Sequence, residues 1–442
     1  METLRVHDRT RNSQILAAVN FPVQGKGNSV VGMYTTIVKL GSPPRDFTVM
    51  IDTGSDLLWV SCSSCDNCPQ SSGLGFKLNF FDMVGSSTAA SILCSDRLCP
   101  IGVQGAVVRC PPPTKQCGYT YGYVDNSTTS GVYVIDEMHY DMILGQSSHS
   151  GVNTSGTVFF GCSTHQDGGL TETSRAIDEI FGFGPGPLSV VSQLSARGTI
   201  PRAFSHCLKG DGNGGGILVL GAVVEPSIVY SPLVPSQQHY YLKLESVAVN
   251  GLPLSINPDA FASTKYADRG TTIDSGTALA YLVQAVYDPL IAAINTIVSQ
   301  YSSPFILEGN PCYPDSTSVD IFPSVSFNFA GGASMDVKPT QYLVHNDLTD
   351  AAMWCIGFQK AEIGLQILGD LVLKDKIIVY DLDNQRIGWT NYNCSMPVNV
   401  NVTLNKDTKI NPRERQSSSI SSKLGILSKL LPVIIVAFFL CT

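Results

Sequence analysis

Short runs of apolar and β-branched residues, each broken by turn residues, recur along most of the chain. Residues 45–52 and 271–274 are such runs, and residues 239–251 form a hairpin-like stretch that ends in Asn-Gly. This spacing is typical of β-strands joined by tight turns. The sequence Leu-Ser-Val-Val-Ser-Gln-Leu at residues 188–194 is expected to form a short helix. The pattern predicts an all-β or β-rich protein.

The composition agrees with this prediction and argues against several other classes of protein. The chain has 442 residues, of which 43% are hydrophobic and 14% are charged. It is long enough for two or three domains and too poor in charge for a disordered or coiled-coil protein. Its net charge is −8 (28 − 36), and it has no block of five basic residues. No nucleic-acid partner is expected, because phosphate binding needs clustered Lys and Arg.

Two distant segments of the chain repeat one local pattern. Asp52 and Asp274 each end an apolar or β-branched run, in the sequences Asp-Thr-Gly-Ser and Asp-Ser-Gly-Thr. The two aspartates are 222 residues apart (274 − 52), about the length of one lobe. Each copy is followed later by two apolar residues and a glycine, at residues 180–182 and 367–369. Strand, tight turn and apolar strand therefore recur in the same order, which indicates an internal duplication.

The duplicated pattern resembles the pepsin-like aspartic proteases over residues 29–394. Trp59 stands seven residues after the first aspartate, residues 119–131 look like the flap hairpin of that family, and residues 367–370 look like its second-lobe signature. The cysteine-rich stretch before the flap resembles the insertion of the plant nepenthesin- and nucellin-like branch. The resemblance implies an all-β, bilobal fold, in which two β-barrel-like lobes are related by a pseudo-twofold axis and enclose a central cleft.

The resemblance, together with the composition of the two ends, divides the chain into five expected segments. They are a pro-segment remnant (1–25), a first lobe with the cysteine-rich insertion and the flap (26–228), a second lobe (229–397), a polar stalk (398–422) and an apolar tail (423–442). For the first segment, a frayed terminus is an alternative that the sequence leaves open.

By the same resemblance, Asp52 and Asp274 are the catalytic pair of an endopeptidase that uses no cofactor and no metal. Two carboxyls a few ångströms apart hold one proton between them, because both are not easily ionised together. The ionised carboxyl accepts a proton from water and the protonated one polarises the scissile carbonyl, without a covalent intermediate. Activity is expected at acidic pH, since the pair must keep one proton.

The residues beside each aspartate have types that suit supporting roles. The resemblance implies that the hydroxyl at the second position cross-links the two loops. The glycine N–H can donate to the carboxylate, and the last hydroxyl can bond its outer oxygen. These residues are Thr53, Gly54 and Ser55 in the first half and Ser275, Gly276 and Thr277 in the second.

The expected flap departs from the family pattern at its tip. Val124 and Asn126 stand where glycine is usual. The flap residue is expected to be Tyr123, with Tyr121 as the alternative. The resemblance implies that the hydroxyl of Tyr123 bonds towards Trp59 and that its ring covers substrate. A glycan on Asn126 would crowd the mouth of the cleft.

Twelve of the thirteen cysteines lie between Cys62 and Cys394, an even number that indicates up to six disulfides and an oxidising compartment. Zinc is the alternative, because the first three cysteines have knuckle-like spacing, but no second pair follows at zinc-finger spacing. The pairs implied by the resemblance are Cys62–Cys65, Cys68–Cys162, Cys94–Cys117, Cys99–Cys110, Cys207–Cys394 and Cys312–Cys355.

The two ends of the chain bear on its location. The first nine residues show no apolar signal-peptide core, so either the chain is an N-terminally shortened gene product or the protein is not secreted. The cysteines and the sequons favour shortening. Residues 430–440 form an apolar run of eleven residues after a Ser-rich spacer, shorter than the ~20 that a spanning helix needs. This is the pattern of a GPI attachment signal, with attachment within residues 417–422. A tail anchor or a buried helix is the alternative.

Four Asn-x-Ser/Thr sequons predict N-glycosylation and agree with secretion. They are Asn126, Asn153, Asn393 and Asn401. Together with the tail, they predict a monomer at the outer face of the plasma membrane, attached by a lipid anchor, or a secreted one. Its partners are expected to be protein or peptide substrates.

Other functions are weaker interpretations of this sequence. The chain has no His-Glu-x-x-His and no Gly-x-Ser-x-Gly, so a metalloprotease or a serine hydrolase lacks support. A binding protein on the same fold is the main alternative, because a fold does not determine a function. A structural wall protein has only the GPI-like tail in its favour.

Overall fold

The computed structural model describes residues 18–25, 33–99, 106–110, 115–143, 151–210, 215–262, 270–307, 309–346, 352–361 and 365–400. These residues belong to one compact unit, and a second unit, residues 405–442, lies outside them. Residues 1–17 of the expected pro-segment, the stalk beyond residue 400, the apolar tail and Asn401 also lie outside the described residues. Within the described part, no helix has both the length and the apolar character that crossing a membrane requires.

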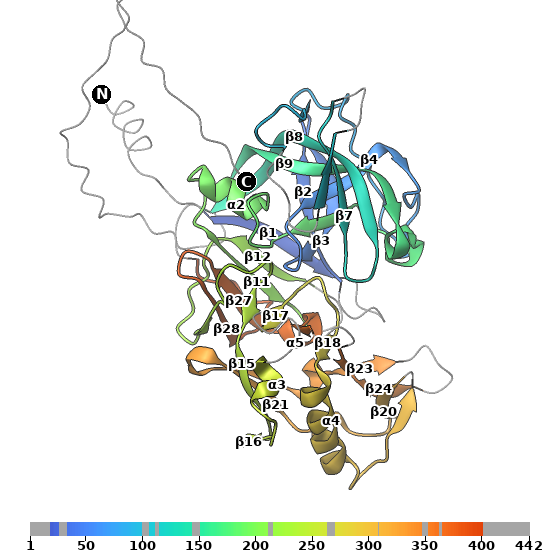
Figure 1. Ribbon diagram of the computed structural model, residues 1–442, viewed down its shortest axis with the longest axis vertical. Helices are drawn as coiled ribbons and strands as arrows, with labels where there is room; N and C mark the ends of the chain where they lie inside the picture. Colours follow the sequence, from blue (N-terminus) through green and yellow to red (C-terminus); the bar gives the residue numbers. More distant parts are fainter. Residues whose placement is uncertain are drawn as a thin grey trace, which may run out of the picture. The chain divides into compact units, whose positions relative to one another are not determined.

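Strands dominate the described chain, which confirms the predicted β-rich fold with two lobes (Figure 1). Fifteen described strands form one sheet in the order β13-β28-β27-β11-β12-β1-β2-β3-β10-β4-β9-β8-β7-β6, with β5 beside β8. Its strands are β1 (Ala18–Gly25), β2 (Tyr34–Leu40), β3 (Arg45–Asp52), β4 (Leu58–Asp66), β5 (Ala90–Ser91), β6 (Ala106–Arg109), β7 (Gly118–Gly122), β8 (Thr128–Ile143), β9 (Gly151–Asp167), β10 (Glu179–Gly182), β11 (Ala203–Leu208), β12 (Gly216–Leu220), β13 (Val229–Pro232), β27 (Lys376–Asp381) and β28 (Arg386–Asn391).

Three smaller sheets make up most of the described second lobe. Their orders are β14-β17-β26-β18-β25, β16-β15-β21-β22 and β19-β20-β24-β23. Their strands are β14 (Tyr241–Leu242), β15 (Leu244–Val249), β16 (Leu252–Pro253), β17 (Thr271–Ile273), β18 (Ala280–Leu282), β19 (Phe305–Leu307), β20 (Asn310–Pro314), β21 (Val325–Phe329), β22 (Ala333–Val337), β23 (Leu343–Asn346), β24 (Met353–Ile356), β25 (Phe358–Lys360) and β26 (Gln366–Leu368).

Short helices connect the strands and cover part of the core. The helix α4 buries Val286, Leu290 and Ile294 at a four-residue spacing, so one of its faces packs against the second lobe. The helix predicted over residues 188–194 is α2, which begins at Val190 because Ser189 is its N-cap. The helices are α2 (Val190–Ala196), α3 (Asp259–Ala262), α4 (Gln284–Val298), α5 (Asp370–Leu373), η1 (Gly168–Thr171), η2 (Thr173–Arg175), η3 (Val319–Ile321), η4 (Ala330–Gly332) and η5 (Pro339–Gln341).

The duplication seen in the sequence recurs in the strand pairing. In the first half, β10 runs parallel to β3 and antiparallel to β4, and its last residue, Gly182, lies opposite Asp52. In the second half, β26 runs parallel to β17 and antiparallel to β18. Each aspartate loop therefore leaves a strand that is paired with the apolar-apolar-glycine strand of its own half.

The structure corrects the predicted end of the pro-segment remnant at residue 25. Residues 18–25 form β1, which pairs with β12, β2 and β8. Val19 and Phe21 are buried in the core. A strand that has partners on both sides and side chains in the core belongs to the folded body. Removing it would expose the neighbouring strands and the core to water.

Two further boundaries differ from the expected ones. β13, β27 and β28 come from the second half, yet they join the sheet of the first lobe, so the division at residue 228 separates the sequence but not the sheet (Figure 1). Residues 398–400, which were expected to begin the polar stalk, belong to the folded body, because Val398 and Val400 are buried and Val400 forms a bridge with Val223.

Two predicted disulfides near the start of the cysteine-rich stretch are wrong. Cys62 is bonded to Cys162, and Cys65 is bonded to Cys68. The reason is the parallel pairing of β4 with β9, which places Val60 opposite Cys162. Cys62 lies two residues further along β4 and therefore on the same face, within reach of Cys162.

The two predicted pairs inside the insertion are also wrong. The sulfur atoms of Cys94, Cys99 and Cys110 lie within 4.8 Å of one another, so only the fold decides which of them pair. The zinc alternative concerned Cys62, Cys65 and Cys68, and each of these is in a disulfide, so none of them offers a thiolate ligand. The observed pairs are Cys94–Cys110 and Cys99–Cys117, and the remaining two, Cys207–Cys394 and Cys312–Cys355, are as expected.

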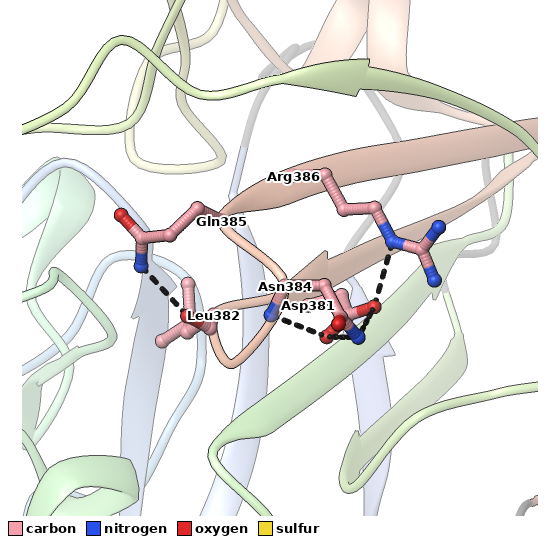
Figure 2. Close-up of polar contacts among 5 residues, drawn as sticks. All are labelled: Asp381, Leu382, Asn384, Gln385 and Arg386. Atoms are coloured by element: carbon pink, nitrogen blue, oxygen red, sulfur yellow. Dashed lines mark hydrogen bonds and ion pairs between the residues drawn. The ribbon is translucent and has the colours of Figure 1, made fainter.

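The turn between β27 and β28 is held by polar contacts of its own (Figure 2). Asp381 accepts hydrogen bonds from Nε of Arg386 at 2.8 Å and from the side-chain amide of Asn384 at 2.8 Å. The guanidinium of Arg386 also lies 3.9 Å from the ring centre of Tyr230, in β13. These contacts link the turn to β13 at the edge of the large sheet.

The place of β1 in the core generates a stability prediction. Phe21 is buried and meets Phe181 edge to face, with ring centres 5.8 Å apart. We expect Phe21→Ala to lower the free energy of unfolding by about 3–5 kcal/mol, measured by urea denaturation. The exposed Gln24→Ala in the same strand is the control. Equal stabilities of the two variants would contradict the assignment of β1 to the folded body.

Candidate active site

Two short loops, one from each half, meet at the aspartates. Asp52 is the last residue of β3, and Asp274 follows β17 directly. The backbone N–H of Thr53 donates to Oγ of Ser275 at 3.2 Å, and the N–H of Ser275 donates to Oγ1 of Thr53 at 2.9 Å. The structure thus brings together the two residues that the resemblance assigned to this cross-link.

The same two hydroxyls also donate across the loops. Oγ1 of Thr53 bonds the carbonyl oxygen of Ile273 at 3.2 Å, and Oγ of Ser275 bonds the carbonyl oxygen of Ile51 at 2.9 Å. All these groups are buried. Four hydrogen bonds therefore fix the position of one loop relative to the other, in a nearly symmetric arrangement.

The Asp52 carboxylate is oriented by its own loop. The N–H of Gly54 donates to its Oδ1 at 2.8 Å, and the hydroxyl of Ser55 donates to its Oδ2. A Cβ atom on Gly54 would lie 2.7 Å from the carboxylate oxygens of Asp274. Only glycine therefore fits between the Asp52 loop and the opposite aspartate.

The Asp274 carboxylate has the matching set of partners. The N–H of Gly276 donates to its Oδ1 at 2.8 Å, and the hydroxyl of Thr277 donates to its Oδ2 at 2.6 Å. A Cβ atom on Gly276 would collide with Oδ1 of Asp52. The two carboxyls thus face each other, and each has one oxygen bonded to a glycine N–H and the other to a hydroxyl.

Burial and mutual repulsion change the acidity of this pair. Burial raises the pKa of Asp52, the charge of Asp274 raises it further, and the hydrogen bonds from Ser55 and Gly54 lower it in part, to a final value of about 7. A carboxyl with this pKa holds a proton across the acidic range. The pair can therefore carry one proton between its two members.

A third carboxyl, Asp56, lies close behind the first loop. Its Oδ1 accepts a hydrogen bond from the N–H of Gly186 at 2.8 Å, and the N–H of Gly184 bonds the carbonyl oxygen of Ser55 at 2.7 Å. Burial raises the pKa of Asp56 to about 6. The sequence analysis gave this residue no role. The available signal was an acidic residue at the start of an apolar run.

A fourth carboxyl, Asp370, is buried beside the second loop, where its backbone N–H bonds the carbonyl oxygen of Thr277 at 2.8 Å. Within the described part of the chain, neither of its oxygens has a hydrogen-bond partner. Burial raises its pKa well above the usual range, and the charges of Asp274 and Asp52 raise it further. Asp370 was part of the predicted second-lobe signature, but its closeness to the pair emerges only from the fold.

Tyr380 is a site residue that sequence reasoning missed. Its hydroxyl lies 3.3 Å from Oγ1 of Thr53 and 3.4 Å from the carbonyl oxygen of Ile273, so it bonds both loops. Its ring stacks on Phe204 with the centres 4.2 Å apart. A tyrosine in an apolar strand gives no signal of this role, since core positions of a strand commonly carry aromatic residues.

The hairpin of β7 and β8 places tyrosines beside the aspartates. Nε1 of Trp59 donates to the hydroxyl of Tyr123 at 2.7 Å, which is the contact that the resemblance implies. The ring of Tyr121 lies 5.0 Å from that of Tyr123. Burial raises the pKa of Tyr123 well above 10, and the charges of Tyr121 and Asp52 raise it further. Of the two candidates, Tyr123 is the one that meets Trp59.

Three of the four predicted glycosylation sites lie within the described residues. Asn126, Asn153 and Asn393 are all exposed. Exposure is what a glycan requires, and their modification stays a prediction.

Comparisons with known proteins agree with this geometry. Residues 34–222 match the family described as Xylanase inhibitor N-terminal, and residues 239–391 match the one described as Xylanase inhibitor C-terminal. Aspartic proteinase 36 of Arabidopsis thaliana is 36% identical over 448 residues, which cover 99% of this chain and 90% of the relative. Aspartic proteinase nepenthesin-1 of Nepenthes gracilis is 28% identical, over 82% of this chain and 78% of the relative.

Solved structures with the same fold are more distant in sequence. The basic 7S globulin from soybean is 18% identical with a TM-score of 0.66, over 86% of this chain and 98% of that chain. The structure titled edgp is also 18% identical, with a TM-score of 0.69, and the match covers 87% of this chain and 97% of that chain. At this identity the likeness concerns the fold alone. The near-full-length match to the plant aspartic proteinases, together with the paired aspartate loops, shows that this chain belongs to the plant branch of the pepsin-like aspartic protease family.

Proposed function

We propose that this protein is an aspartic endopeptidase in which Asp52 and Asp274 are the catalytic residues. The observation that carries the proposal is the symmetric pair of carboxyls, each with a glycine N–H on one oxygen and a hydroxyl on the other. Full-length relatives named as aspartic proteinases support the same activity.

The proposed reaction needs only a water and the two carboxyls. The ionised member of the pair removes a proton from a water between them, and the oxygen of that water attacks the scissile carbonyl carbon. The protonated member hydrogen-bonds the carbonyl oxygen, and the amide nitrogen then takes a proton as the C–N bond breaks. Because the four bonds between the loops fix both carboxyls in advance, little reorganisation is required during the reaction.

A binding function on the same fold is the competing proposal. The matching family descriptions name a xylanase inhibitor rather than a protease. The intact pair of aspartate loops favours the protease, because an inhibitor needs no proton shared between facing carboxyls.

The cellular context is part of the proposal. We infer a secreted glycoprotein, made as a zymogen and held as a monomer at the outer face of the plasma membrane by a GPI anchor. The six disulfides support an oxidising compartment. The spacer and apolar tail in the sequence support the anchor.

An acidic working range is supported by several carboxyls with raised pKa values. Burial raises the pKa of Glu179, at the start of β10, to about 8, against about 7 for Asp52 and about 6 for Asp56. The folded protein therefore binds these protons more tightly than the unfolded chain does. Acid favours the folded state, and a rise in pH through this range removes that advantage.

The proposed catalytic roles predict a loss of activity in two variants. We expect Asp52→Asn and Asp274→Asn each to lower kcat/KM by about a thousandfold or more, because neither amide can exchange the required proton. The measurement is cleavage of a quenched fluorescent peptide at pH 4. Asp383→Asn, at an exposed position, is the matched control. Full activity in either loop variant, with thermal unfolding unchanged, would refute the assignment.

The raised pKa values predict how stability depends on pH. The free energy of unfolding should be largest below about pH 4, where the acids of the unfolded chain are also protonated, and should fall as the pH rises towards 8. The side chain of the Glu179→Gln variant has no proton to lose. We therefore expect the slope of its free energy of unfolding against pH to be smaller than that of the unchanged protein, by the equivalent of about one proton. Urea denaturation between pH 4.5 and 8 gives both slopes. Identical slopes for the two proteins would show that Glu179 ionises normally.

The proposed anchor predicts release by a specific enzyme. Phosphatidylinositol-specific phospholipase C should move the membrane-bound protein into the aqueous phase. A chain without residues 430–440 should appear directly in the medium, since it lacks the apolar part of the attachment signal. Release by detergent alone would contradict the anchor.

A further inference from the structure

The turn at the tip of the flap presents an asparagine to solvent. The N–H of Tyr123 bonds the carbonyl oxygen of Ser127 at 2.9 Å, and the N–H of Asn126 bonds that of Tyr123 at 3.1 Å. Asn126 has a φ of 65°, a left-handed conformation that asparagine tolerates better than most residues. Its side chain is exposed, and within the described residues its amide has no hydrogen-bond partner. The turn therefore leaves this amide free to carry a substituent.

The residues on either side of Asn126 hold this tip against the first lobe. Ser127 is buried, and its Oγ accepts a hydrogen bond from the N–H of Gly169, in η1, at 3.0 Å. The Asp125 carboxylate accepts the N–H of Ser127 at 2.9 Å and lies 3.7 Å from Nη1 of Arg175, in η2. A group attached to Asn126 would thus extend from a fixed base.

The tip also lies close to the aspartate pair. The hydroxyl of Tyr123 accepts a hydrogen bond from Nε1 of Trp59 at 2.7 Å, and β4, which carries Trp59, pairs with β10, whose last residue lies opposite Asp52. Asn126 is three residues beyond Tyr123 in a closed turn, where the two Cα atoms are less than about 7 Å apart. A bulky group on Asn126 therefore stands beside the approach to the catalytic residues.

We propose that Asn126 carries an N-linked oligosaccharide and that this sugar selects substrates by size, admitting extended peptides and excluding folded proteins. The acceptor is the sequence Asn126-Ser127-Thr128. The selection rests on the proposed protease function, whereas occupancy of the site does not.

The attachment is a group transfer from a lipid-pyrophosphate-linked oligosaccharide of the secretory pathway. The amide nitrogen of Asn126 forms a bond to the anomeric carbon and loses one proton, while the bond from that carbon to the pyrophosphate oxygen breaks. The lipid pyrophosphate leaves with the bonding electrons, and nothing is oxidised or reduced. The transfer precedes folding, so the left-handed turn does not hinder it.

Selection by size follows from the shape of the two kinds of substrate. An extended chain takes up about 5 Å, the spacing between neighbouring strands, whereas a small folded domain is about 30 Å across. A hydrated oligosaccharide on a fixed tip is bulky enough to obstruct a folded domain without blocking an extended chain. The bonds from Ser127 and Asp125 keep the sugar from moving aside together with the flap.

A sequon in β9, beside the far end of β8, supplies a matched control. Asn153 is exposed in β9 and lies opposite Asp141 of β8, thirteen residues along the strand from Thr128 (141 − 128). Thirteen residues of strand span roughly 40 Å, at about 3.3 Å per residue. A sugar on Asn153 would therefore be remote from the flap tip.

The test uses the full chain secreted from a plant host. Thr128→Val removes the flap sequon while it keeps the β-branched shape and the Asn126 turn, and Ser155→Ala removes the control sequon. Glycopeptide masses give the occupancy of each site. Values of kcat/KM are compared for a folded protein substrate and for a quenched octapeptide.

We expect sugar on Asn126, and we expect Thr128→Val to raise cleavage of the folded substrate about fivefold while octapeptide cleavage stays within about twofold. Ser155→Ala should change neither value. An unmodified Asn126, or equal changes for both substrates, would overturn the proposal. If no form cleaves the octapeptide, the protease function fails, and the masses still decide whether the flap is glycosylated.

Discussion

Four reciprocal hydrogen bonds between two loops are the constraint on which the site depends. The N–H and hydroxyl groups of Thr53 and Ser275 bond one another's loops, so neither aspartate can move without its counterpart. The surrounding fold serves to deliver these loops. β3 and β17 end at the aspartates, β10 and β26 pair alongside them, and the hydroxyl of Tyr380 bonds both loops.

Burial gives the site its electrostatic character, because a carboxylate deprived of water becomes a weaker acid. For Asp52, donors from Gly54 and Ser55 limit the effect, whereas Asp370 has no such donor among the described residues and its pKa rises further. Carboxyls with raised pKa values therefore surround the facing pair. A neutral neighbour repels the ionised member of the pair less than a charged one does.

The cysteine-rich insertion and the flap form one structural unit. Trp59, Tyr119 and Tyr121 share a hydrophobic cluster with Cys99 and Cys117, which are bonded to each other. Cys117 directly precedes β7, the first strand of the flap. The insertion therefore supports the flap from the side, and the contacts of Ser127 and Asp125 support it at the tip.

The sequence by itself determined the duplication, the β-rich fold and the two aspartate loops, because each depends on a local pattern. An apolar run that ends in Asp-Thr-Gly or Asp-Ser-Gly specifies a strand and a tight turn wherever it occurs, and Tyr123 could be placed from its neighbours. Only the tertiary structure decided the cysteine pairs, the role of β1, and the approach of Asp56, Asp370 and Tyr380 to the site. These depend on strand register and on which side chains share a buried space, and such contacts between distant residues leave no mark in the local sequence.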